Sequence, residues 1–288
     1  MDEKPTVAVM ANDKKSCNAD CEHCFIPYSG SRSPEETLEI VIQLQDQGFD
    51  VNVTGSELLV NLDYLEAVKQ SDQDWIFTNG LVFIKNPGIF NLLKENNIKT
   101  LHFSAHFGIY DDLNSVPTSL VEKVVKEAVD RGFETRIATT ITSSNYRDVV
   151  EMCQQAYDWG AERIMFIRYI PTGNKILPTE NILKPGEISD FFNLVQEARE
   201  SYSEDDVRIE LHGTFGPRPG SKGEELAKNN CFCPAGKSKF VLTPDDKVYG
   251  CAFLLCTDPI GEYRNNKIMI DEDLLDNRRD TCLTYYLT

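Results

Sequence analysis

Two periodicities alternate along this chain. Short apolar runs are separated by longer stretches in which apolar residues recur every three or four positions. The short runs predict strands, and the helical spacing predicts helices. The predicted strands cover residues 6–10, 49–54, 75–78, 100–104, 134–141 and 163–168. The predicted helices cover residues 35–47, 63–69, 89–95, 117–131, 146–159 and 190–201, and Ser33 and Pro34 cap the first of them.

Six strand–helix units in succession predict an α/β fold. Strands that alternate with helices form a parallel sheet with right-handed connections. Six units suit a partial (β/α)6 barrel, whereas a complete eight-unit barrel would use nearly the whole chain of 288 residues. Ligands of such sheets lie at the carboxyl ends of the strands, so we expect the functional site there.

The pattern changes after residues 207–211. Glycine and proline are frequent between residues 213 and 223 and mark a loop-rich boundary. Beyond it, residues 239–243 and 247–249 predict a β-hairpin that turns at Pro244, Asp245 and Asp246. We therefore predict two domains, a barrel over residues 1–212 and a smaller domain over residues 213–288.

The chain is strongly acidic. It has 29 Lys and Arg against 46 Asp and Glu, and this net charge of −17 opposes binding to nucleic acid. The acidity serves solubility, and a negative cleft would also attract a cationic substrate such as an aminosugar or a basic peptide. No apolar run suits a membrane span, and the first residues lack the pattern of a signal peptide, so we expect a cytoplasmic protein without a membrane partner.

The nine cysteines fall into two groups and one single residue. Three lie within residues 17–24, five lie between residues 231 and 282, and Cys153 stands alone. In a reducing compartment such groups indicate metal sites rather than disulfides. Cys153 has apolar neighbours at helical spacing, so we expect a buried thiol there.

The first group, Cys17, Cys21 and Cys24, has the spacing Cys-x3-Cys-x2-Cys directly after the first predicted strand. Thiolates this close together can bind three irons of one [4Fe–4S] cubane and leave the fourth iron open. An open coordination position is typical of a reactive metal site. The alternative is a zinc knuckle, with His23 or a distant cysteine as the fourth ligand.

This cysteine spacing after the first strand of a partial barrel resembles the signature of the radical S-adenosylmethionine superfamily. The resemblance implies that S-adenosylmethionine chelates the open iron. An electron from the cluster would then cleave it to methionine and a 5′-deoxyadenosyl radical, which abstracts a hydrogen atom from the substrate. We also expect an electron donor such as flavodoxin or ferredoxin.

Further residues match the superfamily one at a time. Gly55, Ser56 and Glu57 resemble its Gly-Gly-Glu stretch, which ends the second strand and binds the methionyl amine. Ser56 replaces the second glycine, and Leu58 follows where the superfamily often has proline. Glu57 suits the role because a carboxylate accepts hydrogen bonds from an ammonium group.

The other candidates lie at the ends of later strands. For the ribose they are Ser104 and, more weakly, Thr140 and Thr142. Arg168 is the candidate for the methionyl carboxylate, with a surface arginine before a turn as the alternative. Four residues around Ser104 would either line a substrate pocket or pack ordinarily, namely His102, Phe103, His106 and Phe107.

The second cysteine group resembles the start of the SPASM domains, or of the shorter twitch domains, that are appended to this superfamily. Its members are Cys231, Cys233, Cys251, Cys256 and Cys282. The resemblance implies a small C-terminal twitch-like iron–sulfur domain, and five cysteines suit one auxiliary [4Fe–4S] cluster with one thiol to spare. We predict Cys231, Cys233, Cys256 and Cys282 as ligands and Cys251 as the spare thiol, with Cys256 as the alternative.

A spare thiol that faces the substrate can return a hydrogen atom to a carbon radical, and this would be epimerization. We therefore expect a radical epimerase that acts on a cationic aminosugar in natural-product biosynthesis, similar to radical epimerases of aminoglycosides or peptides. The first predicted strand begins within ten residues, so we expect no amino-terminal peptide-recognition domain, and this favours a cationic aminosugar over a peptide as the substrate. The alternatives are a dehydrogenase or peptide-modifying maturase whose auxiliary cluster accepts an electron, and a cluster-bearing or zinc-bearing binding protein without turnover.

Overall fold

Parallel strands in two sheets form the barrel wall. The first strand, β1 (Thr6–Met10), pairs in parallel with β2 (Asp50–Thr54). The second sheet runs in chain order through β3 (Trp75–Thr78), β4 (Thr100–Ser104), β5 (Glu134–Ile141), β6 (Arg163–Arg168) and β7 (Arg208–Leu211). These elements belong to a computed structural model, which describes residues 4–107, 116–173, 176–203, 205–215, 235–255, 257–271 and 273.

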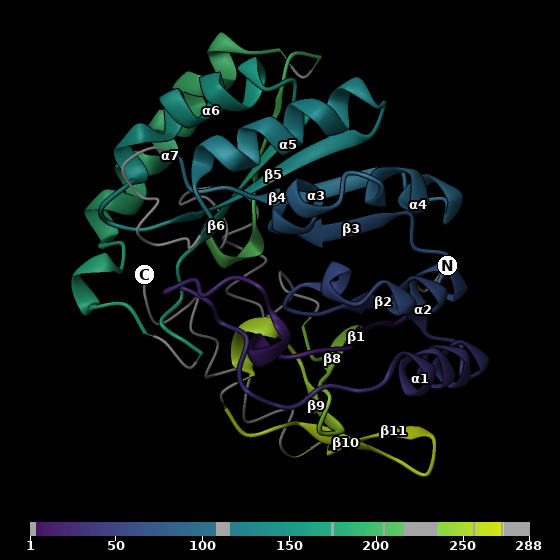
Figure 1. Ribbon diagram of the computed structural model, residues 1–288. Coiled ribbons are helices and arrows are strands. Elements are labelled where there is room, and N and C mark those ends of the chain that lie inside the picture. The colour runs from purple at the N-terminus through teal and green to yellow at the C-terminus, as the bar shows by residue number, and fades with distance from the viewer. Residues whose placement is uncertain are drawn as a thin grey trace.

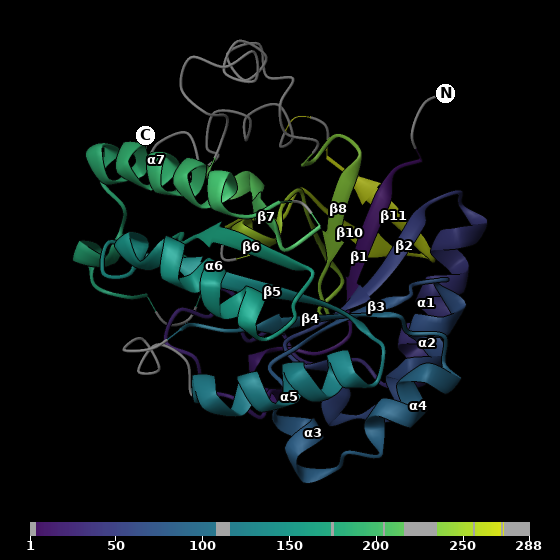
Figure 2. The same cartoon turned by 90° about the horizontal axis from the view of Figure 1, so that it is seen from above.

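Helices connect the strands and surround them on the outside (Figure 1, Figure 2). They are α1 (Pro34–Asp46), α2 (Leu65–Gln70), α3 (Leu81–Lys85), α4 (Ile89–Glu95), α5 (Thr118–Asp130), α6 (Val149–Asp158) and α7 (Pro185–Ser201). The start of α1 follows from a capping box, in which Ser33 Oγ accepts from the Glu36 amide at 3.1 Å and the Ser33 amide donates to Glu36 Oε2 at 2.8 Å. No helix in these described ranges is long and apolar enough to cross a membrane.

A side chain joins the two sheets. Gln73 precedes β3, and its Oε1 accepts from the Val53 amide of β2 at 2.8 Å. Its Nε2 donates to the carbonyl oxygens of Val53 at 3.2 Å and Trp75 at 2.7 Å. The carboxamide therefore satisfies backbone groups that a ladder between β2 and β3 would otherwise satisfy.

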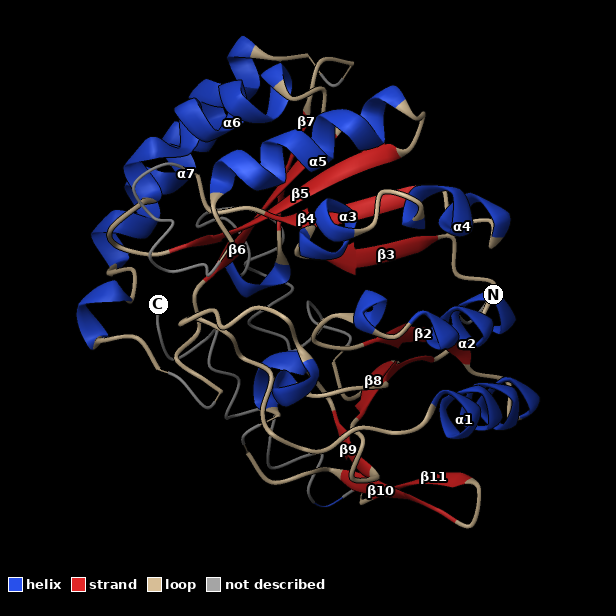
Figure 3. Ribbon diagram, in the orientation of Figure 1, coloured by secondary structure: helices blue, strands red, loops and turns tan. Residues whose placement is uncertain are grey.

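The expected hairpin is present and extends the first sheet. It consists of β8 (Lys239–Leu242) and β9 (Lys247–Tyr249), which pair antiparallel. A second antiparallel pair, β10 (Gly261–Arg264) and β11 (Lys267–Ile270), continues from β9 and lies at the end of the molecule away from α6 and α7 (Figure 3). Because β8 pairs in parallel with β1, the hairpin shares a sheet with the barrel. The boundary near residue 213 stays a prediction.

The strands bury a different apolar cluster on each face. Val7 and Val9 of β1 belong to the large core that includes Leu44 of α1. Met10 points the other way, since successive side chains of a strand alternate. It packs in a smaller cluster with Val241, Tyr249 and Leu255, and Ile26 and Ala252 lie against this cluster. The inner face of β1 therefore contacts both the hairpin and the loop that carries the first cysteines.

The α/β fold with a partial barrel confirms the fold class predicted for the barrel. The six predicted strands are present within one residue of their predicted ends. Helix α7 begins at Pro185, before the predicted start at residue 190. The prediction missed its first turn because the sequence Pro-Gly-Glu shows no apolar period. Helix α3 was not predicted, since five residues are too few to display a period. The twitch-like domain as a whole stays a prediction.

Candidate functional site

The loop between β1 and α1 carries the first three cysteines, and Asp13 fixes its shape. Asp13 is buried and caps a short 3-10 helix, Lys14–Ser16, by accepting from the Lys15 amide at 2.9 Å through Oδ1. Its Oδ2 accepts from the Gly30 amide at 2.8 Å near the far end of the loop. One carboxylate therefore ties the two ends of the cysteine loop together.

The predicted stretch at the end of β2 lies against this loop through Asn12. Asn12 Nδ2 donates to the Glu57 carbonyl oxygen at 3.0 Å, and Asn12 Oδ1 accepts from the Ser56 backbone amide at 2.9 Å. A Cβ atom on Gly55 would lie 2.2 Å from Asn12 Oδ1, so the close approach of the Asn12 side chain to the main chain at position 55 requires glycine there. Ser56 Oγ also donates to the Asp13 carbonyl oxygen at 2.5 Å.

Glu57 is buried beneath this contact. Its Oε2 accepts from Thr78 Oγ1 at 3.1 Å and from the Asn79 amide at 2.8 Å, and its Oε1 accepts from the Leu59 amide at 3.3 Å. Burial raises the pKa of this carboxyl to about 7, and the three donors oppose that rise. In this structure Glu57 joins the ends of β2 and β3, and its role toward a methionyl amine stays a prediction.

The thiols of the cysteine loop are half-buried. Cys17 Sγ accepts from the Ala19 amide at 3.4 Å and from Asn79 Nδ2 at 3.8 Å, and it lies 3.9 Å from the Ser56 carbonyl oxygen. Burial raises the pKa of the Cys17 and Cys24 thiols, and the backbone amides of Ala19 and Ile26, which donate to these sulfurs, oppose the rise.

The donor set suits an iron–sulfur cluster. Three thiols lie along one short loop, and backbone amides of Ala19 and Ile26 point at two of the sulfurs. Within the described residues, no three His, Cys, Asp or Glu side chains converge on a point that suits a single metal ion. A [4Fe–4S] cubane does not need its ligands to converge on one point, because each cysteine binds a different iron.

His23 packs against the barrel. Its ring meets the ring of His106 edge-on, with centroids 4.2 Å apart. His106 follows β4 and is buried, and its Nδ1 accepts from the Thr140 amide at 3.4 Å. This contact fixes the cysteine loop against the ends of β4 and β5.

The remaining predicted residues lie at the ends of their strands. Ser104 and Thr140 are half-buried, and Thr142 is buried. Arg168 is fully buried, and strand alternation places it on the face of β6 that carries the core residues Ile164 and Phe166. Burial lowers its pKa. Contact of Ser104, Thr140 or Arg168 with S-adenosylmethionine stays a prediction.

The residues around Ser104 divide between the core and the inner face. Phe103 and Phe107 belong to the large core, so they pack ordinarily. His102 is half-buried on the other face of β4, where its ring lies 4.5 Å from that of Phe77. Cys153 is fully buried in the core, as expected.

A short turn brings Cys251 toward the same region. Cys251 precedes the 3-10 helix Ala252–Leu254, and its Sγ accepts from the Phe253 amide at 3.4 Å. The ring of Phe253 lies 4.6 Å from that of Phe25 in the cysteine loop and 5.6 Å from that of His212 after β7. The turn therefore lies between the cysteine loop and the end of β7. Cys231, Cys233, Cys256 and Cys282 lie outside the described residues, so the auxiliary cluster stays a prediction.

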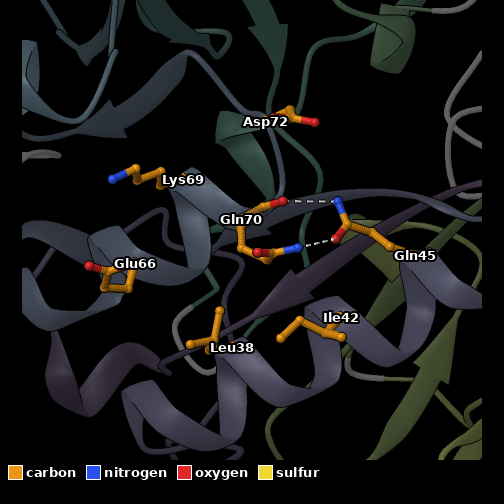
Figure 4. A pocket seen from close by; sticks show the side chains of 7 residues that line it. All are labelled: Leu38, Ile42, Gln45, Glu66, Lys69, Gln70 and Asp72. Carbon is orange, nitrogen blue, oxygen red and sulfur yellow. Dashed lines mark hydrogen bonds between the residues drawn. The ribbon is translucent and has the colours of Figure 1, made fainter.

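Two surface hollows differ in their relation to the site. One flanks Cys17 and is lined by Lys14, Lys15, Cys17, Asn18, Ala19, Asp20 and Tyr28. The other lies on the outside of the barrel between α1 and α2, where the Gln45 and Gln70 side chains bridge it (Figure 4). Only the first of these two adjoins the cysteine loop.

Comparison with known proteins points to one superfamily. No family model matches the chain. It is 25% identical over 165 residues to the antilisterial bacteriocin subtilosin biosynthesis protein AlbA of Bacillus subtilis, a match that covers 52% of this chain and 36% of AlbA. The fold matches Streptococcus suis SuiB bound to S-adenosylmethionine with a TM-score of 0.68 and 17% identity, over 98% of this chain and 67% of SuiB. These similarities support the resemblance to the radical S-adenosylmethionine superfamily that the cysteine spacing indicates.

Two further structures extend the comparison. The enzyme anSMEcpe with bound S-adenosylmethionine superposes with a TM-score of 0.69 and 18% identity, over 97% of this chain and 82% of anSMEcpe. SuiB bound to its precursor peptide SuiA superposes with a TM-score of 0.68 and 16% identity, over 98% of this chain and 66% of SuiB. The chain thus spans about a third of AlbA and about two thirds of SuiB.

Two residues of this site, Asn12 and Asn79, were not predicted from the sequence to contact the cysteine loop. Asn12 gives no signal beyond being a polar residue after an apolar strand. Asn79 belongs to the Thr78-Asn79-Gly80 turn that ends β3, which marks a strand end without indicating that the side chain reaches Cys17. Both act through contacts between residues that are distant in the sequence.

Proposed function

We propose that this protein is a radical S-adenosylmethionine enzyme that modifies a peptide. One observation carries the proposal: the loop with Cys17, Cys21 and Cys24 follows β1 of a barrel whose fold matches, over 98% of the chain, a structure of SuiB with a precursor peptide. AlbA, which is similar in sequence, is named for the biosynthesis of a bacteriocin. A peptide substrate is therefore better supported than the aminosugar predicted from charge alone.

The residues present fit the cofactors that this function needs. Cys17, Cys21 and Cys24 would hold a [4Fe–4S] cluster. When bound, that cluster supplies an electron for the cleavage of S-adenosylmethionine, which yields methionine and a hydrogen-abstracting 5′-deoxyadenosyl group. Asn12 and Gly55 hold the end of β2 against the cysteine loop, so the cofactor-binding candidates Ser56 and Glu57 lie beside the thiols.

The auxiliary cluster and the fate of the substrate radical belong to the proposal as well. The turn that carries Cys251 contacts Phe25 through Phe253, which supports a thiol near the first cluster. Cys251 would return a hydrogen atom if the reaction is epimerization. In the alternative, dehydrogenation or cross-linking, the auxiliary cluster would accept an electron and the peptide would lose two hydrogen atoms.

The first experiment tests the cofactor chemistry. The purified chain is reconstituted anaerobically with iron and sulfide, reduced with dithionite and mixed with S-adenosylmethionine. We expect methionine and 5′-deoxyadenosine in equal amounts. The Cys17→Ala variant should form neither, whereas Cys153→Ala, which removes a thiol buried in the core, should form both. A wild-type chain that retains a cluster and releases no 5′-deoxyadenosine would contradict the proposal.

The second experiment tests the substrate and the reaction. The reconstituted enzyme is incubated in D2O with short peptides encoded beside its gene, and in parallel with aminoglycosides. Deuterium at one carbon with an unchanged formula indicates epimerization, and loss of two hydrogens indicates dehydrogenation or cross-linking. Turnover of aminoglycosides but of none of the peptides would overturn the peptide proposal in favour of the aminosugar.

A further inference from the structure

The carboxamide of Asn79 has an orientation that its neighbours determine. Its Oδ1 accepts from the Leu81 amide at 3.0 Å, so the oxygen lies on the side of α3. The nitrogen therefore faces the opposite side, because an amide presents its acceptor and its donors on different sides. There it donates to Asn18 Oδ1 at 2.8 Å and to Cys17 Sγ at 3.8 Å.

The surroundings hold this carboxamide in place. Asn79 is 8% exposed, and its backbone amide donates to Glu57 Oε2 at 2.8 Å. Glu57 is itself buried and accepts from Thr78 and Leu59. The Asn79 side chain is thus fixed at both its oxygen and its backbone, and one of its two N–H groups is directed to a cysteine that we assign to the cluster.

A hydrogen bond to a cluster sulfur changes how readily the cluster accepts an electron. Donors to the sulfurs stabilise the added negative charge of the reduced form, which raises the reduction potential. The Ala19 amide also donates to Cys17 Sγ, but it belongs to the backbone and cannot be removed by a side-chain substitution. The Asn79 side chain can be removed.

Resting on the proposed function, we propose that Asn79 is a positioning residue that raises the reduction potential of the cluster on Cys17, Cys21 and Cys24 through its N–H···S contact with Cys17. A purely structural role would instead act through Asn18, since that contact is the shorter of the two. Substitutions at Asn79 and at Asn18 distinguish the tuning role from the structural role. Asn18→Ala removes the acceptor of the first N–H and leaves the amide beside Cys17.

The test is a redox titration of the reconstituted protein, followed by the electron paramagnetic resonance signal of the reduced cluster without S-adenosylmethionine. Asn79→Ser keeps an oxygen that can accept from the Leu81 amide but is too short to reach Cys17. Asn79→Asp keeps the size of the side chain and places an oxygen where the N–H donor was. Both midpoints should shift to more negative values, further for Asn79→Asp because it also adds a negative charge, while Asn18→Ala should titrate like wild type.

Wild-type midpoints in Asn79→Ser and Asn79→Asp would overturn the inference. An equal negative shift in Asn18→Ala would also overturn it, because the effect would then come from the shape of the loop. Loss of the cluster from both Asn79 variants, with Asn18→Ala still loaded, would show that Asn79 builds the site rather than tunes it. A wild-type chain that binds no cluster would overturn the proposed function together with this inference, whereas an unchanged potential in a loaded variant overturns the inference alone.

Discussion

Gly173 lies against the main chain of Cys24. A Cβ atom at position 173 would come within 2.4 Å of the Cys24 carbonyl oxygen and 2.8 Å of the Phe25 Cα atom. Gly173 follows β6, on the sheet that does not contain β1, and its φ of +102° is one that side chains rarely adopt. The segment after β6 therefore supports the cysteine loop from the opposite sheet, and no residue larger than glycine fits between them.

We expect Gly173→Ala to displace the cysteine loop. The added methyl group meets backbone atoms, which cannot rotate away, and the positive φ adds on the order of 1–2 kcal/mol. Iron and sulfide retained after reconstitution should fall severalfold. Gly132→Ala is the matched control, because Gly132 also has a positive φ, of +78°, but has no atom within 4 Å of the added Cβ. Equal iron content in the two variants would show that the close approach to Cys24 has no role in cluster binding.

An ion pair joins the exit of the cysteine loop to the hairpin. Arg32 is buried, and its guanidinium donates to the Met10 carbonyl oxygen at 3.2 Å and to Asp246 Oδ1 at 2.6 Å. Asp246→Asn keeps a residue that tolerates the φ of +62° in the β8–β9 turn and removes the charge. We expect a loss of about 1 kcal/mol in the free energy of unfolding, because the Asp246 carboxylate is half exposed and solvent weakens the pair.

Urea unfolding of the protein without cofactors measures this effect. Glu262→Gln is the control, because its pair with Arg264 is longer, at 3.7 Å, and both side chains are exposed. That variant should change the unfolding free energy by less than about 0.5 kcal/mol. If the two variants were equally stable, the Arg32 pair would contribute no more than an ordinary surface contact.

Replacing Cys251 tests the predicted hydrogen-atom donor. In Cys251→Ala, hydrogen abstraction from the peptide can still occur, so 5′-deoxyadenosine should form at close to the wild-type rate. The epimer should disappear, because no thiol returns a hydrogen atom to the substrate radical. Chromatography of the hydrolysed peptide on a chiral column measures the epimer, with Cys153→Ala as the control thiol. Undiminished epimer from Cys251→Ala would assign the donor to another residue.

Local patterns predicted the elements, but they could not predict the partners of those elements. The strand ends agree because apolar runs and glycine turns are properties of short segments, and the cysteine loop was found because its three thiols lie within eight residues. The pairing of β8 with β1 and the Gln73 bridge depend on which distant segments meet. The same holds for the ring contact between Phe25 and Phe253. No spacing within a single segment encodes such contacts.

The lowered pKa of His102, a side chain inside the barrel, predicts that the stability of the folded protein depends on pH. Burial, together with the charges of Arg136 and Arg163, lowers its pKa from 6.5 to about 4, and Glu134 opposes this shift only in part. Below about pH 6.5 the His102 side chain becomes protonated in the unfolded chain, whereas in the folded chain it stays neutral until the pH approaches 4. The folded state therefore loses stability from this group as the pH falls through that window.

His102→Phe should remove this contribution while keeping an aromatic ring beside Phe77 and Trp75. The difference in unfolding free energy between about pH 7.5 and about pH 5 should be smaller in the variant by about 1 to 2 kcal/mol, which follows from the size of the pKa shift. Urea unfolding at both values measures it, and the comparison at about pH 7.5 isolates any change in packing, since His102 is neutral there in both states. If the variant and the wild type lost stability in parallel between the two values, His102 would have the same proton affinity in the folded and unfolded chains, and its burial would have no electrostatic consequence.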